Sequence, residues 1–283
     1  MKKDACDLRY GVLFTPLAIL LAPTLLLIVF PLLFAACTTN PNTVEPEEFP
    51  VSEPDGMPQV FVPAGEFLMG SADSDPDAAD DEKPQHPVYL DAFWIDQTEV
   101  TNGLYMRCVE ASVCSLPVLP GSELIQKPNQ PVQGLAWTQA VDYCEWVGRR
   151  LSTEAEWEKA ARGTDGRLYP WGNELPEEPV ANFDFHFSEF TDVGRFPEGA
   201  SPYGVMDMSG NVWEWTADWY DEDYYARSKY ENPAGPASGI VRSIRGGAWN
   251  TVSRAIRTAN RHWAYPYRDD FVGFRCAKSD LND

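Results

Sequence analysis

The stretch Y-G-V-M-D-M-S-G-N-V-W-E-W-T-A-D-W-Y, residues 203–220, decides how this 283-residue chain is interpreted. Its closely spaced tryptophans, Trp213, Trp215 and Trp219, need a large apolar surface on at least one face. The sequence Ser209-Gly210-Asn211 predicts a turn, because glycine and asparagine tolerate the left-handed backbone that other residues avoid. We therefore expect a tight turn that leads into a buried strand.

Two carboxylates flank this turn. Asp207 precedes it and Glu214 follows it, so the turn can bring both side chains near the carbonyls of Gly210 and Val212. Carboxylate and carbonyl oxygens are the hard ligands that calcium selects. The spacing fits equally well a tryptophan-rich core turn in which the carboxylates cap backbone amides. The residues by themselves leave both interpretations open.

The first 36 residues have the pattern of a targeting segment. Lys2, Lys3 and Arg9 form a basic start, and an apolar run follows to Ala36. Small residues directly before Cys37 indicate a bacterial lipoprotein cleavage site, with Cys37 as the lipidated first residue. The alternative is an uncleaved membrane anchor. Both interpretations attach the chain to a membrane and place the rest outside the cytoplasm.

Composition divides the remainder into two parts. Residues 37–56 are rich in Pro, Glu and Thr without apolar periodicity, which predicts a disordered tether, and residues 57–280 fit one domain. Residues 1–36 carry three basic and two acidic side chains, so the formal charge of −21 becomes −22 without them. A domain this acidic repels phosphates, and we expect no nucleic-acid partner.

Local patterns predict an α+β domain. Helices are expected after an N-cap at Thr101, through an apolar face from Trp137 to Val147, and after the capping box of Thr153 and Glu156. Strands are expected at residues 59–62, 66–69, 88–95, 240–249 with an interruption at Gly246-Gly247, and 272–277.

Apart from Cys6 in the targeting segment and Cys37 at its cleavage site, four cysteines remain: Cys108, Cys114, Cys144 and Cys276. An even number in an exported chain predicts disulfides. Three pairings are open; a bridge from Cys108 to Cys114 would close a short loop and leave Cys144 for Cys276. No Cys-x-x-Cys pair is present, so a zinc site is not expected.

Several segments in order resemble the formylglycine-generating enzyme family, also called the sulfatase-modifying factor family, between Met57 and Lys278. They are F-V-P-A-G-E-F-L-M-G-S at 61–71, D-Q-T-E-V-T-N at 96–102, P-V-Q-G-L-A-W-T-Q-A-V-D-Y-C-E-W at 131–146, R-R-L-S-T-E-A-E-W-E-K-A-A-R-G from 149, Y-P-W-G-N at 169–173, D-M-S-G-N-V-W-E-W at 207–215, R-G-G-A-W-N at 245–250 and V-G-F-R-C-A at 272–277. The resemblance implies an irregular α+β fold related to C-type lectins, with bound calcium.

Two calcium sites are implied by this resemblance. One corresponds to the side chains of Asp207 and Glu214 with the carbonyls of Gly210 and Val212. The first half of the other corresponds to Asn182 and Phe183; its downstream loop is absent, and Asp184, Glu189 or Asp192 would have to substitute. A disulfide between Cys144 and Cys276 is also implied.

The catalytic positions depart from the family. Its enzyme oxidises a cysteine of a sulfatase to formylglycine and holds copper with two cysteines after the Arg-Gly-Gly turn. Soft thiolates are required there because they bind Cu(I). The corresponding residues here are Thr251 and Ile256, so copper and formylglycine-generating activity are not expected.

The three histidines, His86, His186 and His262, lie far apart in sequence, so an iron site is not expected either. A candidate ligand surface follows the Arg-Gly-Gly turn and comprises Trp249, Asn250, Arg254, Arg261 and Trp263. The alternative is that these side chains are structural, as we expect for Arg245 and Arg257.

Two functional hypotheses follow. The first is a lipid-anchored, calcium-stabilised binding or scaffold domain whose partner is a protein, peptide or glycan. The second is an oxidoreductase of the same superfamily that acts on protein cysteines or uses a non-haem metal. The missing cysteines favour the first.

Overall fold

The computed structural model describes residues 55–117, 126–176, 180–267 and 270–280. The predicted targeting segment, Cys37 and nearly all of the tether lie outside these residues. None of the helices in the described ranges is long and apolar enough to cross a membrane. Asp55, the first described residue, has a buried carboxylate that accepts hydrogen bonds from Tyr143 and Arg149.

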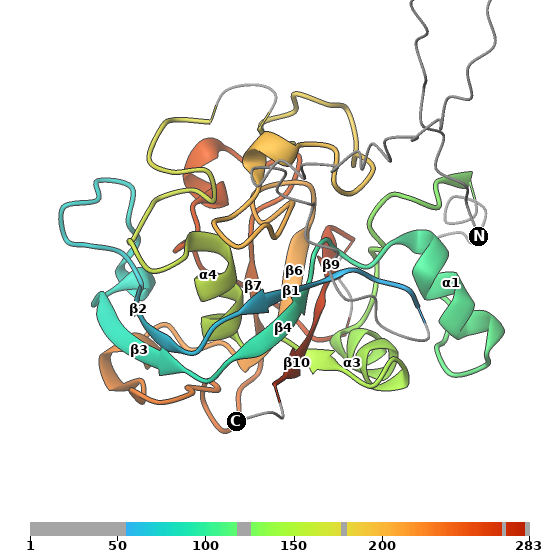
Figure 1. Cartoon of the computed structure of the whole chain (residues 1–283), viewed down its shortest axis with the longest axis horizontal. Helices are drawn as coiled ribbons and strands as arrows, with labels where there is room; N and C mark the ends of the chain where they lie inside the picture. The colour runs from blue at the N-terminus through green and yellow to red at the C-terminus, as the bar shows by residue number, and fades with distance from the viewer. Residues whose placement is uncertain (1–54, 118–125, 177–179, 268–269, 281–283) are drawn as a thin grey trace, which may run out of the picture. The chain divides into compact units, whose positions relative to one another are not determined.

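One antiparallel sheet has the strand order β1-β4-β10-β5 (Figure 1), formed by β1 (Gln59–Val62), β4 (Phe93–Asp96), β10 (Cys276–Ser279) and β5 (Arg150–Leu151). A separate ribbon pairs β2 (Gly65–Met69) with β3 (His86–Leu90). The strands predicted at 59–62 and 66–69 are confirmed. The single strand predicted at 88–95 is wrong, because the chain leaves the ribbon after Leu90 and enters the sheet at Phe93.

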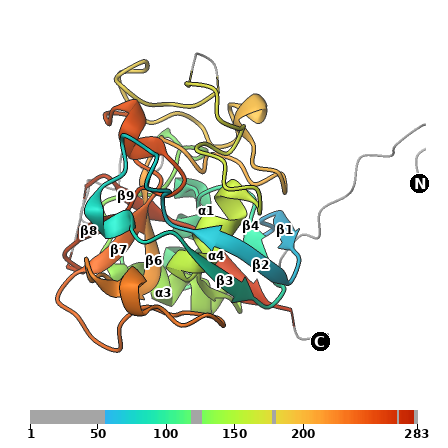
Figure 2. The same cartoon turned by 90° about the vertical axis from the view of Figure 1, so that its left-hand side faces the viewer.

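The second sheet has the order β8-β7-β6-β9 (Figure 2) and contains β6 (Trp213–Trp219), β7 (Arg242–Arg245), β8 (His262–Ala264) and β9 (Val272–Phe274). The strand predicted at 240–249 is confirmed only in part: β7 ends before Gly246, as expected, but no strand resumes at residues 248–249. The single last strand predicted at 272–277 is wrong. β9 pairs with β6 and β10 pairs with β4 and β5, so the chain changes sheets at Arg275.

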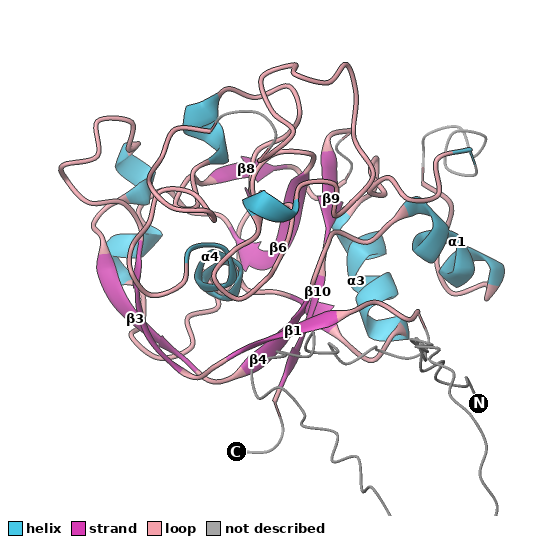
Figure 3. Ribbon diagram, turned by 45° about the horizontal axis from the view of Figure 1, so that its top comes forward, coloured by secondary structure: helices cyan, strands magenta, loops and turns pink. Residues whose placement is uncertain are grey.

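Three longer helices are described: α1 (Asn102–Glu110), α3 (Trp137–Trp146) and α4 (Glu154–Arg162). The expected caps are present, because Thr101 Oγ1 accepts a hydrogen bond from Leu104 and Thr153 forms a capping box with Glu156. Short 3₁₀ helices span Asp80–Glu82, Pro197–Gly199, Tyr224–Arg227 and Ser253–Ile256. The α+β prediction is confirmed, and Figure 3 shows how much of the domain is loop.

Helix α4 lies between the β2–β3 ribbon and the β6–β7 pair (Figure 1). All nine residues of this helix are buried. Its charged side chains have polar partners inside the domain; Lys159, for example, donates to two backbone carbonyls near the start of β2. Arg245 forms ion pairs with Glu154 and Glu158, so this arginine is structural as expected.

Both disulfides are present. Cys108 and Cys114 close a short loop at the end of α1, and Cys144 joins α3 to β10 through Cys276 across 132 residues of sequence. The second bridge connects the core around α3 to the first sheet, so it fixes the segment that supplies Arg275.

Candidate functional site

The predicted turn before β6 has the expected left-handed backbone. Gly210 has φ +83° and Asn211 has φ +61°. A Cβ atom at Gly210 would lie 2.1 Å from the carbonyl oxygen of Asn182, so only glycine fits. The amide of Asn211 donates to that same oxygen at 2.8 Å. The turn therefore joins the residues predicted for the two calcium sites.

Asp207 and Glu214 are both buried beside this turn. Glu214 accepts two hydrogen bonds of 2.7 Å from Arg275, one on each oxygen, and a further one of 2.9 Å from the indole of Trp157. Asp207, which itself has φ +58°, accepts from the amide of Gly194. Glu214 thus already has a cationic hydrogen-bond partner, whereas Asp207 is hydrogen-bonded to the Gly194 amide and to the side chain of Glu99.

Sequence analysis missed a third carboxylate, Glu99, which is fully buried in this cluster. Asn211 Nδ2 donates to Glu99 Oε1 at 3.0 Å, while Glu99 Oε2 is buried without a partner within the described residues. The D-Q-T-E-V-T-N segment contains Glu99, but no local pattern assigns that glutamate a role. Its position in the cluster comes from tertiary packing.

Burial is the largest cause of the raised pKa of two carboxyl groups in this cluster, Glu99 and Asp207. Burial and the neighbouring Asp207 carboxylate raise the pKa of Glu99 well above its usual range, against the opposing effect of Arg275. Burial likewise raises the pKa of Asp207, although the amide of Gly194 and the Arg275 cation lower it. Arg275 therefore faces the three carboxyl groups of Glu99, Asp207 and Glu214, so the acidic groups in this cluster outnumber the positive charge beside them.

A metal ion would need backbone oxygens here. No three His, Cys, Asp or Glu side chains in the described part of the chain are arranged to hold a metal by themselves. The orphaned Glu99 oxygen and the uncompensated carboxylates fit a hard cation that also takes carbonyls such as those of Gly210 and Val212. The oxygen types present are those that calcium binds, and a calcium ion at this position stays a prediction.

The second predicted site is built differently. Asn182 is buried, its Nδ2 donates to the carbonyl of Glu189 at 3.0 Å, and its Oδ1 has no partner among the described residues. Phe183 is buried against Ile256. Of the substitutes considered, Glu189 is paired with Lys127 and Asp184 is exposed.

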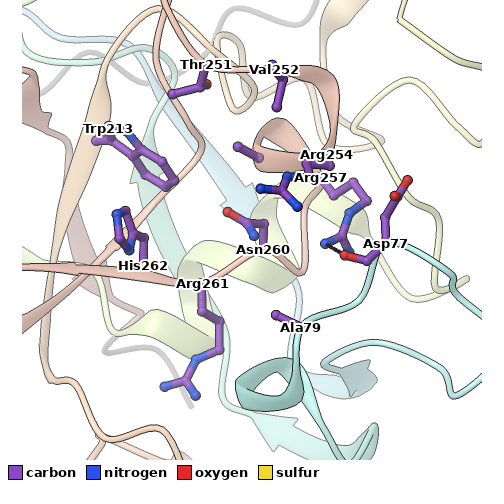
Figure 4. Close-up of a pocket in the computed structure, with 11 residues that line it drawn as sticks. Asp77, Ala79, Trp213, Thr251, Val252, Arg254, Arg257, Asn260, Arg261 and His262 are labelled. Carbon is purple, nitrogen blue, oxygen red and sulfur yellow. Dashed lines mark hydrogen bonds between the residues drawn. The ribbon is translucent and has the colours of Figure 1, made fainter.

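A cleft of about 430 Å³ lies beyond the Arg-Gly-Gly turn (Figure 4). Trp213 and His262 lie on one side of it and Asp77 on the other, and the 3₁₀ helix Ser253–Ile256 supplies Arg254. Asn260 also lines the cleft. The cleft thus combines aromatic, amide and charged side chains.

The three arginines of the cleft differ in their partners. Arg257 is held by Glu82 and Asp75, and Arg261 by Glu154, and both are almost fully buried. Arg254 is exposed, and no hydrogen bond or ion pair joins it to another described residue. Arg254 is consequently the cation in this cleft that remains available to a ligand.

The residues at the family's cysteine positions still converge. A Cβ atom at Gly247 would lie 2.6 Å from Ile256 Cγ2 and 2.9 Å from Thr251 Oγ1. The Thr251 hydroxyl accepts from the amide of Ala248 at 3.0 Å and donates to its carbonyl at 2.8 Å. Ile256 is fully buried. A hydroxyl engaged with the backbone and a hydrocarbon side chain occupy these two positions.

The three histidines are widely separated. His86 contacts Tyr225, His186 contacts Phe183, and His262 contacts Trp213 at the cleft. Of the other candidate ligand residues, Trp263 is 41% exposed, whereas Trp249 and Asn250 are partly buried and do not line the cleft. The structure therefore brings together Arg254, Arg261 and His262, and places Trp263 next to His262.

Comparison with known proteins agrees with this architecture. The family model for the sulfatase-modifying factor enzyme 1-like domain (FGE-sulfatase) matches residues 44–280. The serine/threonine-protein kinase pkn1 of Chlamydia caviae is 38% identical over 240 residues, which cover 77% of this chain and 37% of the kinase. The chain thus spans only about two fifths of the length of the Chlamydia kinases that it matches.

This chain matches most of the length of an enzyme and of a solved structure. The formylglycine-generating enzyme of Streptomyces coelicolor is 33% identical over 277 residues, covering 77% of this chain and 88% of the enzyme. The structure of PvdO from Pseudomonas aeruginosa has a TM-score of 0.70 at 28% identity and covers 80% of this chain and 96% of PvdO. The chain belongs to the family of sulfatase-modifying factor enzyme 1-like domains.

Proposed function

We propose that this chain is a calcium-stabilised binding module of the formylglycine-generating enzyme-like family that lacks the family's oxidase activity. One observation carries the proposal: Thr251 and Ile256 occupy the two cysteine positions, and neither offers a thiolate. Cu(I) needs soft sulfur ligands. Cys108, Cys114, Cys144 and Cys276 are paired as disulfides in this structure, so they supply no thiolate ligand either.

The cleft supports a binding role. Its volume is about 430 Å³, and Trp213 and His262 form an aromatic wall. Arg254 is exposed there and has no partner among the described residues. Arginine and tryptophan are the residue types that dominate binding energy at interfaces. In this proposal the chain is held at the outer side of a membrane by lipid on Cys37, and its cleft faces a protein, peptide or glycan.

The test is an oxidation assay on the full-length chain. We expect no aldehyde from a cysteine-containing peptide in the presence of Cu(I) and oxygen, and no stoichiometric copper on the chain. The double variant Thr251→Cys, Ile256→Cys should bind Cu(I), because both side chains already meet at Gly247. The single variant Thr251→Cys is the control, since one thiolate cannot form the pair.

The alternative is an oxidoreductase that uses another metal in the same cleft. Two results would overturn the binding proposal in favour of that alternative. One is aldehyde formation by the unmodified chain, and the other is retention of about one iron or copper ion per chain. Such a result would make His262 the first cleft residue to replace.

Calcium removal tests the stabilising part of the proposal. A cation that binds only the folded state stabilises it by about 2.7 kcal/mol at a free concentration of about 100 times its Kd. We therefore expect a chelator to lower the melting temperature of the chain and added calcium to restore it.

The matched variants are Asp207→Gly and Ser112→Gly. Glycine keeps the φ of +58° without strain and removes the carboxylate, so the Asp207→Gly protein should no longer respond to chelator or calcium. Ser112 is exposed and has a similar φ of +61°, so its glycine variant should respond like the unmodified chain. An unchanged response in Asp207→Gly would show that Asp207 is not a ligand.

A further inference from the structure

Strand β8 is an edge of the second sheet, because the order β8-β7-β6-β9 gives it only β7 as a neighbour. An edge strand presents main-chain N–H and C=O groups that no second strand satisfies. Other edges of the domain are covered by the chain itself. On β9 the carbonyl of Phe274 accepts a hydrogen bond of 2.9 Å from Val100, and on β3 the amide of Tyr89 donates to Tyr230 at 2.8 Å.

The main chain of Trp263 points to the edge at β8. Trp263 lies opposite Ser243 of β7. The carbonyl of Ser243 accepts a hydrogen bond of 3.1 Å from the hydroxyl of Thr216 on β6, so the peptide groups of Ser243 are directed at β6 and away from β8. In an antiparallel pair, opposite residues that do not exchange hydrogen bonds direct their N–H and C=O groups away from each other. The N–H and C=O of Trp263 consequently face the open side of β8.

This side of β8 is open to solvent. No hydrogen bond joins the main chain of Trp263 to a described residue outside β7. His262 is exposed, and Trp263 is 41% exposed. Natural edges are commonly protected by lysine or proline, and β8, with the sequence His-Trp-Ala, contains neither. The open edge ends at Pro266, whose carbonyl accepts a hydrogen bond of 3.0 Å from the amide of Trp137.

An extended peptide matches such an edge, because its own main chain supplies N–H and C=O groups at the spacing of a neighbouring strand. Its successive side chains would lie on opposite faces of the sheet. On one face Trp263 and Tyr265 have ring centroids 5.8 Å apart. On the other face His262 lines the cleft together with Trp213. Both faces therefore offer aromatic surface to the side chains of an added strand.

The chain's own tether does not suit this edge. Proline has no N–H to donate to a ladder. No more than four consecutive residues of the segment 37–56 are free of proline. Its prolines are Pro41, Pro46, Pro50 and Pro54.

Charge distinguishes the remaining occupants. Two copies of this domain repel each other, because each carries the formal charge of −22 that remains without residues 1–36. The same charge repels acidic segments of other proteins and attracts basic ones. Complementarity of charge thus favours a basic segment of a different protein over a second copy of this chain.

We propose that a basic, extended segment of another protein adds to β8 as a further strand of the second sheet. It forms main-chain hydrogen bonds with Trp263 and places alternate side chains against Tyr265 and in the cleft beside His262. The main chain supplies affinity, and the two faces select the side chains. This inference rests on the proposed binding function and names its partner class.

The experiment is selection of a display library of random linear peptides on the full-length chain, followed by calorimetric titration with the most enriched peptide in synthetic form. We expect enriched peptides to carry net positive charge and to lack proline where they pair. Two N-methylated versions of that peptide, one methylated at odd and one at even positions, keep every side chain and charge. One version should lose binding and the other retain it, because only alternate residues direct their N–H groups at β8.

Trp263→Pro and Trp263→Val are the matched variants. Both remove the indole ring, but only proline removes the outward N–H, which the ladder to β7 does not use. We expect the proline variant to bind the peptide about tenfold more weakly than the valine variant does. Equal binding by the two variants would show that the main chain of Trp263 does not hold the peptide, and would overturn strand addition at β8.

The remaining outcomes are also decisive. Retained binding of both N-methylated peptides would overturn strand addition. Dimerisation of the chain that Trp263→Pro abolishes, measured by sedimentation, would assign the edge to a second copy instead. No enrichment by a chain that forms no aldehyde in the oxidation assay would refute this inference alone. Aldehyde formation in that assay would refute the proposed function itself.

Discussion

Replacing Arg275 by methionine is expected to destabilise the domain by about 3 to 5 kcal/mol, because it leaves buried carboxylates without their cation. Arg275 is fully buried and donates to both oxygens of Glu214 at 2.7 Å. It also donates to the carbonyls of Asp96, Gln97 and Met206. Methionine fills similar volume but supplies none of these donors. Guanidinium denaturation of both proteins measures the loss.

Arg150→Met is the matched control for this prediction. Arg150 also forms two hydrogen bonds of 2.7 Å with one carboxylate, that of Glu156, but its side chain is 40% exposed. Exposed pairs contribute about 1 kcal/mol or less. A loss for Arg275→Met as small as that for Arg150→Met would show that burial of the carboxylate cluster is not what makes Arg275 important.

Removing the long-range disulfide is the second large effect. The double variant Cys144→Ala, Cys276→Ala should lose about 4 to 5 kcal/mol, because the bridge closes a loop of 132 residues in the unfolded chain. Chemical denaturation under oxidising conditions measures it. The same substitutions at Cys108 and Cys114, which are six residues apart, should cost only about 2 kcal/mol.

The comparison between the two bridges isolates the loop length. All four cysteines are buried, so the loss of sulfur atoms from the interior affects both double variants similarly. Equal losses would mean that local packing around the sulfur atoms, and not the length of the closed loop, determines the stabilisation.

Local signals predicted much of the fold correctly. The caps of α1 and α4, the left-handed turn at Gly210-Asn211 and the short strands near the start of the domain depend on neighbouring residues. A cap or a turn needs only a few side chains and the backbone beside them. Such features are therefore readable from sequence, and the ordered motifs then led to the correct family.

Changes of sheet could not be predicted in this way. Residues 272–277 alternate as one strand would, yet the chain leaves β6 and joins β4 at Arg275. An alternating pattern of apolar and polar residues indicates that successive side chains point to opposite faces of a strand. It does not identify the strand with which the segment pairs. The same limit explains why residues 88–95 were predicted as one strand instead of the end of β3 and β4.

The sequence by itself determined the family, the turn at Gly210-Asn211, the identity of Thr251 and Ile256, and the residue types available at the cleft. These depend on which side chains are present and on their spacing. Only the tertiary structure decided that Glu99 joins Asp207 and Glu214, and that Arg257 and Arg261 have ion-pair partners whereas Arg254 has none among the described residues. Those properties depend on contacts between residues far apart in the chain, and burial then sets their electrostatic and binding consequences.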